Sequence, residues 1–494
     1  MAEVTLIAET KKGRKPSPGE IAKIIAEHGG DAEELADYID GLYDMDPEQL
    51  ASNAGRACYE SEMPAIDKEK IKVKERLFDT GHHTTLEHSY FTFSIDDISV
   101  STITFGLHLA HPFYNSDQRS GRYSKMYDEP DLGEISRRVE TYSLQECPKD
   151  SFASMNVDQV MDFIGYGLNV FGENKEKLTD IAADVLRRER PNVSDKYVEQ
   201  NAKKMAQEQL RVFVSTVAPT GMYHTVDLAT LAALFRVAWT PEMRQTANLM
   251  KDSVLEKHPV IGYMFDEGKT SRQSYNFIAH DAAEKQVCFF PMLRIEDIDI
   301  PPDYVPGLQV AKDSVDLSAF EPHCMDNNVY SIRTSVELST MTMGQDQRHR
   351  TISRGKPSIT GDFYLPPLLK IAGLEDKAEK FRKKWVDLRT FGPGVMQFTI
   401  PYGARVRYQK RGSINALLHE ISKRSCWCTQ EEIYNLSIQL VRQLNERGLH
   451  DLIERMVPPC KYDHCIEGAR SCGRDLGVWK GFAERLAGFQ QRQI

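Results

Sequence analysis

The sequence lacks the features of membrane-spanning and secreted proteins. None of its 494 residues belongs to a run of about 18 consecutive apolar residues, the length that a membrane span needs. The N-terminal segment MAEVTLIAETKKGRKPSPGE has no apolar core of signal-peptide length. We therefore expect a cytoplasmic protein without a membrane partner.

An excess of positive charge is also missing. The chain has 62 Lys and Arg against 72 Asp and Glu, which gives a formal net charge of −10. Because an acidic surface repels phosphate backbones, we expect no nucleic-acid partner, and a polyanionic ligand needs a local cluster of arginines. The length predicts two or three domains.

Cysteine is scarce and odd in number. Nine cysteines in a long chain without a secretion signal argue against a disulfide framework. Cys460, Cys465 and Cys472 lie near the C-terminus, and Cys426 and Cys428 form a Cys-x-Cys pair upstream. Four thiolates can bind zinc or an iron–sulfur cluster, but this spacing is not that of a zinc knuckle. We favour reduced thiols or a redox pair and predict no metal site.

Apolar periodicity predicts a mixture of strands and helices. Residues 89–96 alternate aromatic and polar side chains and predict a strand, and residues 98–111 predict a helix. Helical spacing extends over residues 196–258 and over 413–448, where it breaks near Cys-Trp-Cys. Residues 395–409 are strand-like.

Two other stretches have turn chemistry. The Pro-rich residues 294–323 indicate a linker or a long surface loop. The first 50 residues alternate turn signals with short amphipathic runs and predict a small helical extension.

One pattern occurs twice along the chain. A strand-like run, a helix-like run and a cationic turn follow one another in residues 89–122 and again in 327–353. Residues 213–239 are a weaker counterpart of the strand and helix that begin near residue 395. This repetition predicts a duplicated unit.

The two cationic turns are candidate anion sites. In QDQRHRTIS, which begins at Gln345, Arg348 and Arg350 flank His349, and their planar donor forks match phosphate. In RSGRYSK (119–125), a Ser-Gly pair lets backbone amides approach a phosphate monoester beside Arg122. A salt-bridged loop and an ordinary polar turn are the alternatives.

Together these segments resemble the flavin-dependent thymidylate synthase family. The matching segments are RACYES (56–61), GHHTTLEHSYFTFSID (81–96), SGRYSKM (120–126), QDQRHRTIS (345–353), DFYLPP (362–367) and NALLHEISKRSCWCTQEEI (415–433). The resemblance covers most of residues 50–455. It implies an α+β fold of two tandem units, each a small, mostly antiparallel sheet with packed helices. The expected domains are a helical extension (1–50), a first unit (51–275), a second unit (276–458) and a Cys-containing tail (459–494).

The family signature is divided between the halves. Ala110, His111 and Pro112 stand in the first half where the family has Arg-His-Arg, while RGKPSITGDFY in the second half replaces the family's S-x-R-Y segment. Members of the family are tetramers whose sites combine several subunits. The resemblance therefore implies a homodimer that forms a pseudo-tetramer, with active sites composed from both halves.

The resemblance also assigns roles to residues. FAD would be bound by His82, Thr84, Glu87, Arg348, His349 and Arg350. Deoxyuridylate would be bound by Ser120, Gly121, Arg122, Gln345 and Arg424, of which Ser120, Arg122 and Arg424 would take part in catalysis. Gln397, Asp227 and Ala229 replace residues with which the family binds the nucleotide.

The implied reaction is reductive methylation of dUMP to dTMP, with methylenetetrahydrofolate as carbon donor and NADPH as reductant of the FAD. Two alternatives stay open. One is a flavin-dependent one-carbon transferase that acts on another pyrimidine nucleotide. The other is a nucleotide-binding homologue without catalysis.

Overall fold

The computed structural model divides the chain into two compact units. Unit 1 comprises residues 1–119 and 219–274, and unit 2 comprises residues 120–218 and 275–494. The residues of the predicted first domain (51–275) are thus divided between the two compact units. The predicted domain limits describe the proposed sequence duplication and stay a prediction. The structure describes residues 1–11, 23, 27, 46–64, 69–110, 113–121, 130–143, 145, 156–271, 274–279, 286–301, 304, 322–461, 465, 467–474, 476–486 and 491–494.

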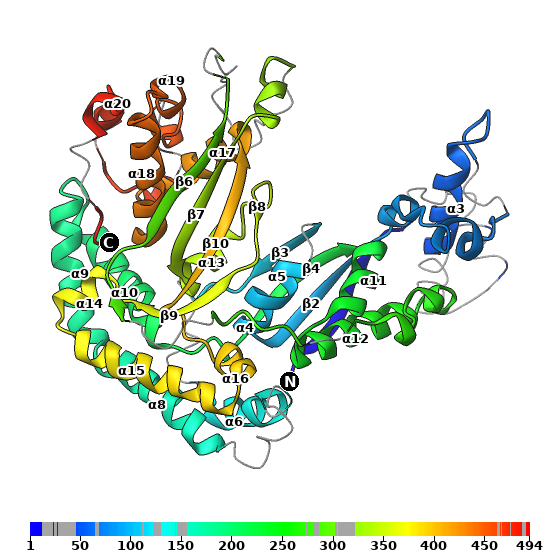
Figure 1. Ribbon diagram of the computed structural model, residues 1–494, viewed down its shortest axis with the longest axis horizontal. Coiled ribbons are helices and arrows are strands. Elements are labelled where there is room, and N and C mark those ends of the chain that lie inside the picture. Colours follow the sequence, from blue (N-terminus) through cyan, green and yellow to red (C-terminus); the bar gives the residue numbers. More distant parts are fainter. Residues whose placement is uncertain are drawn as a thin grey trace. The chain divides into compact units, whose positions relative to one another are not determined.

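Unit 1 contains an antiparallel sheet with the strand order β1-β2-β4-β3 (Figure 1). Its strands are β1 (Glu3–Glu9), β2 (Tyr90–Ser99), β3 (Tyr114–Gln118) and β4 (Pro219–Asp227). Its helices are α3 (Pro47–Ala57), α4 (Val100–Thr102), α5 (His108–Ala110), α11 (Leu228–Val237) and α12 (Pro241–Leu255), with the short helices η1 (Lys74–Phe78), η2 (His83–His88), η3 (Ile103–Leu107), η7 (Pro259–Met264) and η8 (Glu267–Lys269).

The core of unit 1 follows from the period-two pattern of β2. Phe91, Phe93 and Ile95 alternate with more exposed residues and are buried against apolar side chains of α11 and α12. The predicted strand at 89–96 is therefore confirmed as β2, and the predicted helix at 98–111 corresponds to the helical turns that follow it.

Unit 2 contains a larger sheet with the strand order β5-β9-β10-β7-β6, and β8 also pairs with β10. The strands are β5 (Val287–Cys288), β6 (Met292–Asp299), β7 (Ser331–Ser339), β8 (Ser353–Arg354), β9 (Ser358–Tyr364) and β10 (Ala404–Ser413). All pairings are antiparallel except the parallel contact of β5 with β9.

Helices complete unit 2, and two of them cover its sheet. The helices α17 (Ile414–Arg424) and α18 (Glu431–Asn445) bury their apolar faces against β6 and β7 (Figure 1). The others are α6 (Leu132–Arg138), α8 (Val157–Glu173), α9 (Lys175–Glu189), α10 (Asp195–Leu210), α13 (Thr340–Asp346), α14 (Pro367–Ile371), α15 (Glu375–Asp387), α16 (Pro393–Phe398), α19 (His450–Ile453) and α20 (Phe482–Arg485). The mixed content and mainly antiparallel pairing agree with the expected α+β class.

Four predicted segments differ from the structure. In the predicted helical extension (1–50), residues 3–9 form the strand β1, because Val4 and Leu6 pack on the sheet of unit 1, and most of residues 12–45 lie outside the described residues. The strand β4 interrupts the predicted helix at 196–258, and its buried face includes the polar residues Thr220 and His224, so apolar and polar residues do not alternate along it. The strand β6 occupies the start of the predicted loop at 294–323, where a bulge breaks its period-two pattern. The helix α16 begins at Pro393 and extends to Phe398, so it occupies the start of the segment 395–409 that we predicted to be a strand.

Candidate active site

The cationic turn of unit 2 begins at the end of α13. Ser339 caps this helix by accepting a hydrogen bond from the Thr342 amide (3.2 Å). The turn then presents Arg348 to solvent, leaves Arg350 half-buried and buries His349. The structure thus gives the three residues of the Arg-His-Arg motif different environments.

Asp346, the last residue of α13, fixes this turn. Its buried carboxylate accepts hydrogen bonds from Lys410 Nζ (2.5 Å), Arg354 Nε (2.5 Å) and Tyr408 Oη (2.8 Å). Arg354 Nη1 also donates to the carbonyl oxygens of His349 and Ile352, both at 2.9 Å. Although burial opposes ionisation, the Arg354 and Lys410 cations hold the pKa of Asp346 well below its usual range.

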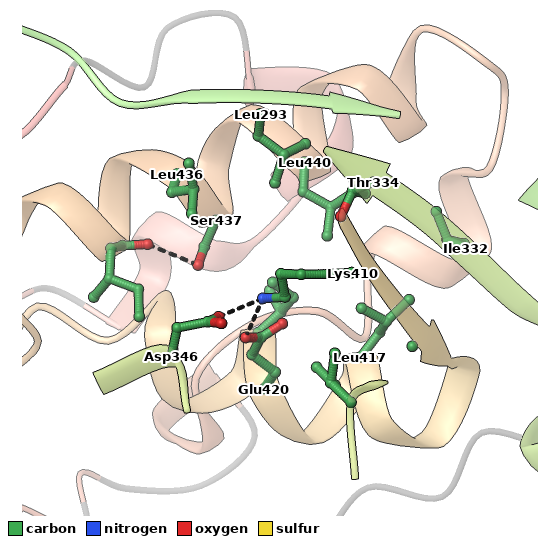
Figure 2. Close-up of a pocket in the computed structure, with 14 residues that line it drawn as sticks. Leu293, Ile332, Thr334, Asp346, Lys410, Leu417, Glu420, Leu436, Ser437 and Leu440 are labelled. Atoms are coloured by element: carbon green, nitrogen blue, oxygen red, sulfur yellow. Dashed lines mark hydrogen bonds and ion pairs between the residues drawn. The ribbon is translucent and has the colours of Figure 1, made fainter. Parts of the chain in front are cut away.

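Lys410 links Asp346 to a second buried carboxylate. Its Nζ lies 2.7 Å from Glu420 Oε1, so one ammonium group bridges two acids (Figure 2). The three side chains line a cavity of about 20 Å³, which Ser437 and Leu440 also border. A cavity of this size holds one water molecule.

His349 is the most unusual group of the turn. Its side chain is 7% exposed, and neither ring nitrogen has a hydrogen-bond partner among the residues that the structure describes. Burial, together with the nearby Arg424 cation, lowers its pKa to about 2, so the imidazole is neutral. A buried polar group without a partner is rare in folded proteins and indicates a missing ligand or water.

Gln345 and Arg424 lie beside this turn. Arg424, at the end of α17, donates from Nη2 to the Gln345 carbonyl oxygen (2.7 Å). The Gln345 side chain donates to the Oε1 of Gln430, the residue before α18. Within the described part of the chain, Gln345 Oε1 and Gln430 Nε2 are buried without partners, which leaves one acceptor and one donor on this hydrogen-bonded amide pair.

The helix α10 connects this group to the first-half segment Ser-Gly. Gln207 Nε2 donates to the Gly121 carbonyl oxygen (3.2 Å), and the next residue, Glu208, interacts electrostatically with Glu431 at the start of α18. Glu431 is buried and accepts a hydrogen bond from Tyr364 Oη (3.1 Å). Burial, with Glu208 and Glu432 nearby, raises the pKa of Glu431 to about 8. Ser120 and Gly121 therefore belong to the same compact unit as Gln345, His349 and Arg424.

The other predicted site residues are elsewhere or outside the description. His82, Thr84 and Glu87 lie on the surface of unit 1, at the start of and within the short helix η2. Arg122, Pro112 and His111 fall outside the described residues.

Two residues that replace the family's nucleotide ligands have structural partners. Gln397 Oε1 accepts from the Phe277 amide (2.9 Å), and its Nε2 donates to the Tyr275 carbonyl oxygen (3.4 Å). Asp227 caps α11 by accepting from the amide (2.7 Å) and the hydroxyl (2.9 Å) of Thr230. Ala229 packs on the core of unit 1.

Sequence reasoning included Arg354 in the cationic cluster but missed the supporting residues Asp346, Lys410, Glu420 and Glu431. A signal existed for some of them, because Lys410 and Glu420 are charged residues at positions that the strand and helix patterns place inside. Nothing in the local sequence marks Asp346, whose side-chain partners come from two strands, Arg354 from β8 and both Tyr408 and Lys410 from β10.

Within the described ranges, no helix combines the length and apolar character that crossing a bilayer requires. The described cysteines are all free thiols, and no three described Cys, His, Asp or Glu side chains converge as metal ligands would.

Comparison with known proteins gives a family for part of the chain. A family model described as thymidylate synthase complementing protein matches residues 41–260. No curated protein matches. One similar solved structure is the UMP/dUMP methylase PolB from Streptomyces cacaoi bound with 5-Br dUMP (14% identity, 56% of this chain and 98% of that chain, TM-score 0.31). Another is thymidylate synthase X from Helicobacter pylori with FAD and dUMP (17% identity, 45% and 93%, TM-score 0.27). Over residues 41–260, the chain is therefore similar to the thymidylate synthase complementing protein family.

Proposed function

We propose that this protein is an FAD-dependent thymidylate synthase that methylates dUMP reductively to dTMP, with methylenetetrahydrofolate as carbon donor and NADPH as reductant. The observation that carries the proposal is the buried, neutral His349 between two arginines, with both ring nitrogens unpartnered. The family match over residues 41–260 supports the same function.

The residues of the turn fit FAD. A neutral imidazole has one donor and one acceptor nitrogen and so suits a heteroaromatic ring or a ribose hydroxyl, while arginine forks suit a diphosphate. We assign FAD to Arg348, His349 and Arg350, with His82, Thr84 and Glu87 of unit 1 as further ligands. When bound, the flavin supplies the hydride that completes the methyl group.

The amide pair beside the turn fits a pyrimidine base. Gln345 Oε1 offers an acceptor and Gln430 Nε2 a donor, and a uracil imide edge offers the complementary N–H and C=O. Arg424 lies next to this pair, where its cation would stabilise negative charge that develops on a uracil carbonyl. Ser120, Gly121 and Arg122 would hold the nucleotide phosphate.

We propose further that the chain is a tandem duplication with composite sites. The strand order β1-β2-β4-β3 of unit 1 recurs as β6-β7-β10-β9 in unit 2. Each unit also has a buried glutamate with the same kind of partners. In unit 1, Glu242 at the start of α12 accepts hydrogen bonds from Ser99, which caps α4, and from Thr102. In unit 2, Glu432 at the start of α18 accepts hydrogen bonds from Ser339, which caps α13, and from Thr342. A homodimer of such chains would supply the four units of a tetramer.

The test is a mass-spectrometric assay for dTMP with FAD, NADPH, methylenetetrahydrofolate and dUMP. We expect product from the wild type and a loss of about 10²-fold or more in Arg348→Ala and Arg122→Ala. Arg333→Ala, which removes an exposed arginine of β7, is the control and should keep wild-type activity. Absence of product from wild-type protein that binds FAD would reject the thymidylate synthase assignment.

A mixing experiment tests how the sites are composed. Because Ser120–Gly121 and the Arg-His-Arg turn share unit 2, we expect each site to use both segments of one chain. A mixture of Arg122→Ala and Arg350→Ala proteins should therefore show no more activity than the two variants measured alone. Recovery of activity on mixing would instead require sites that combine different chains.

One observation favours a second candidate, a flavin-dependent one-carbon transferase for another pyrimidine nucleotide. Gln397 and Asp227, which replace nucleotide ligands of the family, are engaged in backbone contacts. An assay with other uridine and deoxyuridine nucleotides distinguishes this candidate by its product. A protein that lacks the flavin absorbance bands near roughly 375 and 450 nm and does not take up FAD would instead be a homologue without catalysis.

A further inference from the structure

The turn between α17 and α18 in unit 2 has a feature that the turn between α11 and α12 in unit 1 lacks. The unit 1 turn consists of residues 238–240, whereas the unit 2 turn is longer, residues 425–430, and carries the Cys-Trp-Cys sequence. The extra residues are not needed to join the two helices, because the shorter turn joins an equivalent pair. The insertion therefore calls for a separate explanation.

The two thiols of this turn are close enough to interact. The Cys428 amide points at Cys426 Sγ (3.5 Å), and the Cys428 thiol also hydrogen-bonds Cys426. Cys428 Sγ lies 3.1 Å from the Arg470 carbonyl oxygen. Both side chains are partly accessible, so a small molecule can reach them.

Charged side chains of both signs lie near the turn: Arg492 favours a thiolate at Cys426, and Glu467 opposes one. Arg190 Nη2 donates to the Trp427 carbonyl oxygen (2.7 Å), and Arg492 Nη1 donates to that of Thr429 (3.1 Å). The guanidinium of Arg474 stacks over the Trp427 ring, with 4.0 Å between its Cζ atom and the ring centroid. The Cys428 hydrogen bonds are the main cause that lowers the pKa of Cys426 to about 7, and they raise that of Cys428 above its usual range. One thiol of the pair is thus reactive and the other holds its proton.

We propose that Cys426 and Cys428 form a thiol–disulfide exchange site for small-molecule disulfides of the glutathione class, with Cys426 as the attacking thiol and Cys428 as the resolving thiol. The Cys426 thiolate attacks one sulfur of the disulfide, forms a mixed disulfide and releases one thiolate. Cys428 then loses its proton and attacks Cys426 Sγ, which closes the Cys426–Cys428 disulfide and releases the second thiolate. The two protein thiols are oxidised and the small disulfide is reduced to two thiols. This chemistry requires neither flavin nor nucleotide.

The test is to incubate the reduced full-length protein with glutathione disulfide, alkylate the remaining thiols and map the peptides by mass spectrometry. Wild-type protein should give an internal Cys426–Cys428 disulfide, seen as the loss of two hydrogens from one peptide. Cys428→Ser should instead accumulate glutathione on Cys426, and Cys426→Ser should accumulate little at either position. Cys58→Ser, which removes an exposed thiol of unit 1, should behave as wild type.

Several results would overturn the proposal. They are glutathione trapped on Cys428 with Cys426 unmodified, a disulfide that joins Cys426 to Cys460, Cys465 or Cys472, or stoichiometric zinc or iron in the purified protein that protects these thiols from alkylation. If a serine variant folds poorly, the peptide map of the wild-type protein still shows which cysteines form the disulfide. Alanine variants at positions 426 and 428 provide a second pair of variants for the same test.

Discussion

At the scale of single residues, the most consequential group is Asp346. A lone buried carboxylate is costly, but this one faces two cations and a tyrosine hydroxyl. Arg354 carries the effect to the cationic turn, because the same guanidinium that binds Asp346 holds the carbonyl oxygen of His349. The position of His349 therefore depends on a carboxylate that does not belong to the family motif.

Replacing Asp346 by asparagine should destabilise the protein strongly. The substitution leaves Lys410 and Arg354 buried with one counter-charge fewer, and breaking a buried pair in this way costs about 3–5 kcal/mol. We expect a corresponding shift of the urea unfolding midpoint and a loss of FAD binding. Asp297→Asn, which removes an exposed partner of Arg333, should change stability by less than about 0.5 kcal/mol. Equal stability of the two variants would contradict the role of Asp346.

Glu431 gives a pH dependence of the opposite sign from an ordinary salt-bridged acid. Its pKa is about 8 in the folded protein and about 4.3 when unfolded. Between these values the folded state binds more protons, so this group stabilises fully below about pH 4 and its contribution is lost as the pH rises through 8. Between the two pKa values, the contribution of this one group to the free energy of unfolding falls by up to about 1.4 kcal/mol per pH unit.

Substitution of Glu431 by glutamine should remove this dependence. A neutral amide keeps the shape and can still accept the Tyr364 hydrogen bond, so the difference in unfolding free energy between Glu431→Gln and wild type should grow in favour of the variant from pH 5 to pH 8. Urea unfolding at several pH values measures it. Glu379→Gln, at a half-buried position of α15 where the acid pairs with Arg382, provides a comparison in which the pKa is lowered rather than raised. A constant difference across this range would show that Glu431 is ionised at neutral pH.

At the scale of elements, packing decides how closely α8 can approach its neighbours. A Cβ atom at Gly167 would lie 2.0 Å from the Phe213 carbonyl oxygen and 2.6 Å from the Phe381 ring. Gly165, on the same helix, has no atom within 4 Å of such a position. The two glycines therefore have the same helical backbone, but only Gly167 is packed too closely against its neighbours to accept a Cβ atom.

We expect Gly167→Ala and Gly165→Ala to have opposite effects. The first should destabilise by about 1–3 kcal/mol, because α8 must move away from Phe213 and α15. The second should stabilise by about 0.5–1 kcal/mol, because alanine is the better helix former. Thermal unfolding of both variants measures the contrast, and a stabilised Gly167→Ala protein would mean that α8 does not contact Phe213 as described.

Elements with a clear apolar period were predictable, and those whose shape depends on distant partners were not. The strand β2 and the helix α17 have regular patterns and one solvated face each, so their existence was apparent from the sequence. The helix α18 is mostly buried, but its apolar residues recur at helical spacing, which also made it apparent. The buried face of β4 includes the polar residues Thr220 and His224, and β6 has a bulge, so neither shows a simple alternation of apolar and polar residues. In the site, the Arg-His-Arg turn was recognisable as a cluster of cationic residues. The roles of Gln430 and of the residues around Asp346 could not be predicted, because they depend on contacts between segments that lie apart in the sequence.

At the scale of the whole molecule, the chain passes between its compact units three times, after Arg119, Ala218 and Ser274. Unit 2 therefore depends on helices from both halves of the sequence. Within it, Phe163 of α8 stacks on Phe381 of α15 with ring centres 4.8 Å apart, and Lys177 of α9 donates to the Ala372 carbonyl oxygen (2.7 Å). Cutting the sequence at its middle would separate these partners.

A fragment of residues 1–274 should accordingly fail to fold by itself. Its helices α8, α9 and α10 would expose the apolar surface that α14 and α15 cover, and such surfaces lead to aggregation. We expect the fragment to be insoluble when produced alone and to form a soluble complex, measured by size-exclusion chromatography, when produced together with residues 275–494. Phe381→Ala in the second fragment should weaken the complex, since loss of a buried phenylalanine costs about 3–5 kcal/mol. A monomeric 1–274 fragment that unfolds cooperatively would mean that the first half of the chain carries its own complete core.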